Sequence, residues 1–239
     1  MTFGRRNGSS WLRYVKPSHF RGNAKVNVAH PQSLFARKAR LETSNARIKG
    51  NFTTSSSLEL VTVNALIEAN VVMLSSASFD EPPTQLTMHT KNAAITANLD
   101  LANPSASSYT SSSDPADSSV GGNFEIESET SNSRSTISVQ SQPYSSYLSL
   151  TAHTSNSACE VSLARQFSGS FRLASSVMSP VLRISSPTKE KNRNRSIDFS
   201  TKEKGRLEGS ATWYNSRGKR EGGGSVDVST SVLPAILNL

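Results

Sequence analysis

The sequence predicts an all-β protein, a β-solenoid-like stack of short strands, and three observations lead to this fold class. Short runs in which apolar and polar residues alternate recur from residue 34 to the C-terminus, and such alternation places the apolar side chains on one face of a strand. The runs come in pairs joined by similar segments, which indicates a repeat. Serine and threonine supply 63 of the 239 residues, and both are mediocre helix formers.

Each repeat unit consists of two alternating runs. A single unit cannot bury its apolar face, whereas several stacked units can, which is the principle of a solenoid. We therefore expect residues 34–239 to form a single β-repeat domain. The predicted pairs of runs are 58–60 with 67–71, 86–88 with 95–101, 124–126 with 137–139, 148–150 with 161–163, 171–173 with 181–184, and 226–228 with 236–239.

The segment inside each pair predicts a sharp corner. It reads Thr-x-Asn-Ala or Thr-x-Asn-Ser in five units, and the asparagines are 19, 28, 40 and 24 residues apart. Asparagine tolerates left-handed backbone and bonds to nearby backbone groups, so stacked corners would let the Asn side chains form a ladder. Two later units, 175–178 and 229–232, keep the frame without the asparagine. The predicted structural corner residues are Asn45, Asn64, Asn92, Asn132 and Asn156.

The repeated corner resembles a fungal (basidiomycete) family of domains of unknown function, whose units typically read T-S-N-G-x-I. The clearest matches are residues 41–48 and 86–95, and the similarity covers roughly residues 34–239. That family is similar to a bacterial adhesin domain. The resemblance therefore implies a β-solenoid and a non-catalytic, adhesin-like interaction module that binds a protein or a glycan. This chain departs from the family by carrying Ala or Ser where the family favours Gly after the asparagine.

Three segments lack the repeat pattern. Residues 1–33 are basic and are predicted to be a poorly ordered lead-in, with a short strand at 26–28. Residues 103–123 are rich in Ser, Pro, Gly and Asp, which is typical of a disordered loop. Residues 187–206 are predicted to be a basic loop around Ile197 and Phe199.

The net charge of +8 is divided unevenly along the chain. Residues 1–50 carry +10, residues 51–187 carry −6 and residues 188–239 carry +4, which sum to +8. The basic flanks suggest an alternative function, the binding of nucleic acid or an anionic surface. No known nucleic-acid-binding pattern is present, so solvated basic tails are the favoured interpretation and nucleic acid is not expected as a partner.

The sequence predicts no catalytic residues, no metal site and no cofactor. His89 and His153 occupy equivalent places before two corners and could lie near each other, but no two histidines have the spacing of metal ligands. There is no G-x-S-x-G motif, and the aspartates form no pair that the repeat would align. A carbohydrate-active enzyme on a solenoid remains an alternative. The four histidines are His19, His30, His89 and His153.

The remaining features concern location and covalent modification. Cys159 is the single cysteine, which excludes an intramolecular disulfide, and we expect it to be a buried or half-buried residue in a strand. The basic N-terminus leads into no apolar segment, so no secretory signal is predicted and an intracellular location is favoured. No apolar run is long enough to span a membrane. Glycosylation sequons occur at Asn7, Asn51 and Asn194.

Overall fold

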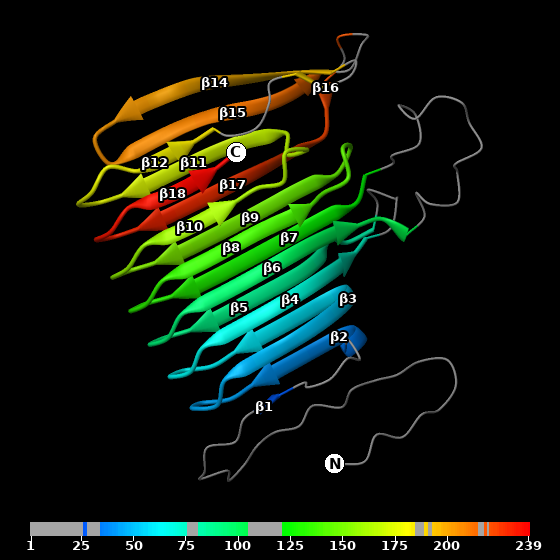
Figure 1. Ribbon diagram of the computed structural model, residues 1–239, viewed down its shortest axis with the longest axis vertical. Helices are drawn as coiled ribbons and strands as arrows, with labels where there is room; N and C mark the ends of the chain where they lie inside the picture. The colour runs from blue at the N-terminus through cyan, green and yellow to red at the C-terminus, as the bar shows by residue number, and fades with distance from the viewer. Residues whose placement is uncertain are drawn as a thin grey trace.

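The computed structural model describes almost only β-strands, arranged as a stack (Figure 1). The predicted all-β fold is therefore confirmed. The first strand, β1 (Val26–Asn27), lies where a short strand was predicted. The rest of 1–33 and residues 105–120 of the predicted loop lie outside the described part of the chain. The described residues are 26–27, 34–75, 81–104, 121–184, 189–190, 193–214, 218 and 220–239.

The strands form two parallel series. Each repeat of the stack, which we call a coil, contributes one strand to each series. The first sheet contains β2 (Leu34–Glu42), the second half of β3 (Ile48–Val61), β5 (Thr84–Thr90), β7 (Asn123–Thr130) and β9 (Tyr147–Thr154). The second sheet contains β1, the first half of β3, β4 (Ile67–Leu74), β6 (Ile95–Ala102), β8 (Ser135–Ser141) and β10 (Cys159–Ser162). A Thr-x-Asn corner joins the two strands of a coil, so equivalent residues lie beside one another in neighbouring coils.

The core is the space enclosed by the inward faces of the strands. Leu58, Leu86, Ile126 and Leu150 are register neighbours on successive strands of the first sheet, and each is at most 2% exposed. Burying a side chain of this size stabilises the fold by about 1.5–3 kcal/mol. A sequence poor in apolar residues can therefore form a core, because the period-two pattern directs those residues inward.

The order of the coils in the stack differs from their order in the sequence at the last coil. β17 (Gly223–Thr230) lies between β9 and β11 (Gly169–Ser175), and β18 (Ala235–Asn238) lies between β10 and β12 (Val181–Arg183). The alternating runs were predicted as units in chain order. The structure instead inserts the final unit between two earlier ones (Figure 1).

The predicted basic loop at 187–206 is wrong, because much of it forms strands. β14 (Arg193–Glu203) and β15 (Arg206–Tyr214) form an antiparallel hairpin that continues the first sheet from β11. Gly205, at the turn, has φ of +82°, a conformation that glycine adopts without strain. Arg195, Ile197 and Phe199 alternate along β14, and this alternation was too short and too charged to be recognised. Two short strands, β13 (Lys189–Glu190) and β16 (Arg220–Glu221), extend the hairpin.

Candidate interaction surface

The five corner asparagines form one ladder on the surface of the stack. The side-chain amide of each asparagine after Asn45 donates to the side-chain oxygen of the asparagine one coil earlier, at 2.6–2.8 Å. All five side chains are exposed. The ladder runs from Asn45 through Asn64, Asn92 and Asn132 to Asn156.

In the last three of the five corners, the threonine has a second structural role that sequence analysis missed. Its hydroxyl donates to a backbone carbonyl in the corner of the preceding coil, whereas the hydroxyl of Thr62 is buried without a partner. The regular spacing of Thr two residues before Asn is the sequence signal that indicates this role. The bonds run from Thr90 to Ala65 at 3.4 Å, from Thr130 to Ala93 at 3.0 Å, and from Thr154 to Ser133 at 3.0 Å.

The outer face of the second sheet carries a further row of amides. Asn70 donates to Asn51 at 2.8 Å, and Asn98 donates to Asn70 at 2.9 Å. Later in the stack, Asn238 donates to the hydroxyl of Ser162 at 2.8 Å. These side chains satisfy one another, so this face is largely occupied by its own hydrogen bonds. Of the predicted sequons, Asn51 and Asn194 are exposed on strands, and Asn7 lies outside the described residues.

The outer face of the first sheet differs because it carries unneutralised charge. Glu125, Glu127 and Glu129 alternate along β7 and are all exposed; we call them the acidic row. The neighbouring strands β5 and β9 contain no lysine or arginine. Their outward residues are instead hydroxyl, amide, imidazole and phenol side chains.

The contacts of the acidic row come from uncharged groups and from one histidine. The amide of Gln85 donates to Glu125 at 2.8 Å. Nδ1 of His89 lies 3.3 Å from a carboxylate oxygen of Glu129. Among the described residues, this histidine is the one basic side chain that forms an ion pair with the acidic row. The row is therefore a line of carboxylates at the centre of the sheet.

On either side of the acidic row, arginine side chains form ion pairs with other carboxylates of the same face. Towards the N-terminal coil, Arg40 contacts Glu59 at 2.8 Å. Towards the C-terminal hairpin, Arg172 lies 3.7 Å from Asp227 and 3.6 Å from Glu208. These outer carboxylates are paired, so the negative potential of the face is concentrated on β7.

The structure places His89 and His153 in one line across the first sheet but not in contact. Glu129 lies between them in the register, because β7 separates β5 from β9. Nδ1 of His153 is instead 3.0 Å from the hydroxyl of Ser229. Among the described residues, no group of three or more His, Cys, Asp and Glu side chains is placed to hold a metal ion. His19 and His30 lie outside the described residues.

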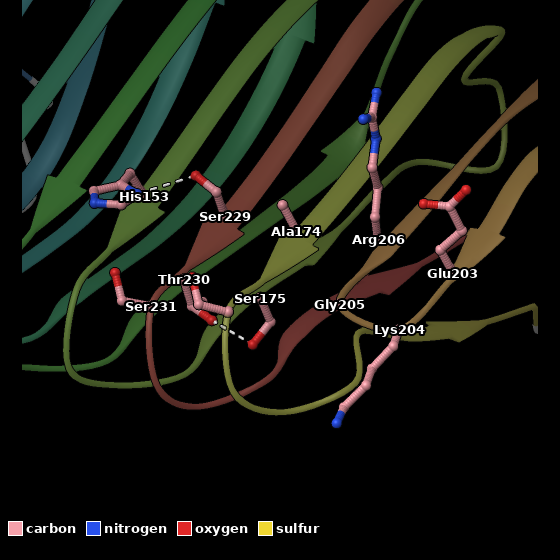
Figure 2. Close-up of a pocket in the computed structure, with 11 residues that line it drawn as sticks. His153, Ala174, Ser175, Glu203, Lys204, Gly205, Arg206, Ser229, Thr230 and Ser231 are labelled. Atoms are coloured by element: carbon pink, nitrogen blue, oxygen red, sulfur yellow. Dashed lines mark hydrogen bonds between the residues drawn. The ribbon is translucent and has the colours of Figure 1, made fainter.

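A recess continues this line towards the C-terminal hairpin (Figure 2). The register runs from His153 through Ser229 and Ala174 to Arg206. The depression lies over Ser229 and Ala174, because their side chains are short. The side chain of Lys204 points away from it in Figure 2. Among the described residues, Glu203 is the one carboxylate that lines the recess.

Cys159 lies in β10 and is fully buried, as predicted. Burial raises the pKa of its thiol to about 12, against a smaller lowering by a hydrogen bond with Ser135. Only a thiolate is a strong nucleophile or metal ligand, so this protonated thiol acts as a small core residue.

The basic residues of the described flanks lie mainly on the two end strands of the first sheet, β2 and β14. Lysine and arginine on an edge strand discourage pairing with another sheet. Arg195 on β14 differs, since its side-chain nitrogens are buried and lack hydrogen-bond partners. Its guanidinium lies 5.7 Å from the ring centre of Trp213, and burial lowers its pKa.

Comparisons with known proteins identify a family and no function. The model of a family described as a domain of unknown function (DUF7330) matches residues 38–196, about two thirds of the chain. No curated protein matches the sequence. No solved structure matches the fold. No helix in the described part of the chain is long and apolar enough to cross a membrane.

Proposed function

The chain belongs to the DUF7330 family of domains of unknown function, and we propose that it is a non-catalytic, adhesin-like interaction module. Its binding surface is the outer face of the first sheet, centred on the acidic row. The observation that supports this proposal is a line of three exposed carboxylates without arginine or lysine on either adjoining strand. The corners and the second sheet satisfy their own amides, whereas the acidic row leaves its charge available to a partner.

The spacing of the acidic row favours a basic polypeptide as the partner. Alternate residues of a strand are about 6.8 Å apart, so the carboxylates match the alternate side chains of an extended segment with lysine or arginine at every second position. The hydroxyl groups of Thr87, Ser149 and Thr151 beside the row can hydrogen-bond to such a segment. A glycan is the alternative partner, because the same hydroxyl and carboxylate groups bind sugars.

Arrays of basic peptides and of glycans, probed with the full chain, test the proposal. The test variant is Glu125→Gln/Glu127→Gln/Glu129→Gln. Removing three exposed charge pairs should weaken binding about tenfold. The matched control, Glu81→Gln/Asp100→Asn/Glu203→Gln, removes three exposed carboxylates elsewhere and should bind as the unmodified chain does. Ligands that bind both variants equally would contradict the assignment of the surface.

The carbohydrate-active enzyme is less well supported. Glycoside hydrolysis generally needs two carboxyl groups on either side of the scissile bond. Of the acids that the structure describes, only Glu203 lines the recess in Figure 2. Turnover of a polysaccharide by the full chain, lost in Glu203→Gln, would favour this alternative.

Binding of nucleic acid or an anionic surface also ranks below the interaction module. On β2, Arg40 pairs with Glu42 and Glu59, and β2 and β14 are the strands where basic residues protect sheet edges. Salt-sensitive binding of DNA or of anionic vesicles, abolished by deleting residues 1–33 and neutralising the lysines and arginines of 187–206, would support this function instead.

A further inference from the structure

The C-terminal coil, residues 223–239, occupies a slot between two coils that precede it in the chain. Gly223–Thr230 pairs with Tyr147–Thr154 on one side, and residues 225–230 pair with residues 170–175 on the other. In the second sheet, β18 pairs with β10 and β12. Figure 1 shows β17 and β18 inside the stack rather than at its end.

The C-terminal coil is the connection between the two coils that it separates. Among the described residues, no backbone pairing joins β9 directly to β11, or β10 directly to β12. Without the coil, four strand edges would present unpaired N–H and C=O groups, and such edges readily accept another strand. The slot would also lose Val226, Val228 and Leu237, each at most 1% exposed.

The connection that precedes the coil contains glycines in positive-φ conformations. Gly218 has φ of +72° and Gly222 has φ of +68°. An added Cβ at Gly218 would meet nothing within 4 Å, so that glycine lies in open space. The hairpin β14–β15 holds β11 from its other side. The coil thus follows a glycine-containing connection, and its slot is formed by other residues.

We propose that this slot also accepts the C-terminal coil of a second copy, so that the protein assembles by strand exchange. The backbone pairings and the buried side chains are the same whether the coil comes from its own chain or from another. Whether the slot takes its own coil or that of a second copy then depends on two concentrations. One is the effective concentration of the tethered coil near its own slot, and the other is the concentration of other chains in solution. Dilute chains close on themselves, and chains that fold together at high concentration exchange coils. This proposal does not depend on the function proposed above.

Cysteine cross-linking of full-length chains tests the exchange. Thr151 on β9 and Asp227 on β17 are register neighbours on the outer face, and adjacent strands lie about 4.8 Å apart, within the range of a disulfide. Chains carrying Thr151→Cys are labelled with nitrogen-15, mixed with unlabelled Asp227→Cys chains, unfolded, refolded together and oxidised. The chains stay reduced until they have refolded, and Cys159 is then buried, so it does not compete in the oxidation.

Two controls make the result decisive. Thr87→Cys replaces Thr151→Cys in a matched mixture; it lies in the same outward line but on β5, two strands from β9. The double variant Thr151→Cys/Asp227→Cys must close within one chain, which establishes that the bond can form. We expect the mixed cross-link between labelled and unlabelled chains to exceed the Thr87→Cys control about tenfold after joint refolding at high concentration. A double variant that closes, together with mixed yields no higher than the control, would overturn the proposal.

Discussion

At the scale of single residues, the repeat is explained by two hydrogen-bonding side chains with different environments. The corner asparagines bond to one another at the surface, and the hydroxyls of Thr90, Thr130 and Thr154 bond to backbone carbonyls in the interior. Both bonds join one coil to the next. The Thr-x-Asn pattern therefore fixes how each coil is aligned with the next. This alignment places equivalent outward side chains in lines across the sheets.

The buried threonine hydroxyls should contribute measurably to stability. Thr130→Val keeps the shape but leaves the carbonyl of Ala93 without its donor at 3.0 Å, and a buried acceptor that loses its partner costs about 1–3 kcal/mol. Thr87→Val, on the outer face of β5, should change the free energy of unfolding by less than about 0.5 kcal/mol. Urea unfolding of both variants measures the difference. Equal stabilities would show that the corner bond contributes nothing.

Arg195 should make the folded protein less stable than an apolar residue would. Its buried guanidinium has no hydrogen-bond partner, and replacing a buried charge by a hydrophobic residue of similar size is often neutral or stabilising. We expect Arg195→Met to raise the free energy of unfolding by about 1 kcal/mol. The control Arg172→Met, with an exposed side chain, should stay within about 0.5 kcal/mol of the original chain. A marked loss of stability in Arg195→Met would mean that the guanidinium has a stabilising partner.

At the scale of elements, Glu160 on β10 links several strands of the second sheet. Asn238 of β18 donates to it at 3.2 Å, Arg183 of β12 lies 3.6 Å away, and Arg134 forms an ion pair with it. Desolvation raises the pKa of this carboxyl, but the hydrogen bonds from Asn238 and Arg134 and the charges of Arg134 and Arg183 outweigh it, so the net pKa is lowered.

The lowered pKa of Glu160 predicts a pH dependence of stability. The unfolded chain binds the proton more readily, so stability is fully present above the ordinary pKa of 4.5 and is lost as the pH falls towards the folded value. Glu160→Gln should lower stability at pH 7 and should flatten the decline below pH 4.5. Urea unfolding across this range, with Glu127→Gln as the exposed control, measures the effect. A decline as steep in Glu160→Gln as in the unmodified chain would contradict the assignment.

The alternating runs predicted strands well because strand pattern is local. Leu86-Thr87-Met88 already shows which side chains face inward, and the structure agrees. The position of β17 could not be predicted in this way, since insertion between β9 and β11 depends on pairings between residues far apart in sequence. The hairpin β14–β15 was missed because charged residues interrupt its alternation.

The candidate surface was only partly visible in the sequence. The alternation of Glu125, Glu127 and Glu129 is explicit, but its neighbours come from coils 24 and 40 residues away. Aligning the repeats on their asparagines would have placed Glu129 beside His89 and His153, since each lies three residues before its corner asparagine. The absence of a lysine or arginine beside the row becomes meaningful only once that alignment is made.

At the scale of the whole molecule, charge and topology divide the stack into regions with different roles. Basic edge strands lie at the two ends of the first sheet, and the acidic row lies at its centre. The net charge of +8 therefore hides a negative central face. This arrangement favours a basic partner on the outer face of the first sheet.

The central claim, that the acidic row binds an extended basic segment, is tested most directly by nuclear magnetic resonance. The nitrogen-15-labelled full chain is titrated with a peptide that carries lysine at every second position, and with a peptide of the same composition in which the lysines are contiguous. We predict tighter binding of the alternating peptide, shift changes confined to β5, β7 and β9, and loss of both in Glu125→Gln/Glu127→Gln/Glu129→Gln. Equal binding of the two peptides, or shift changes that persist in the triple variant, would contradict the claim.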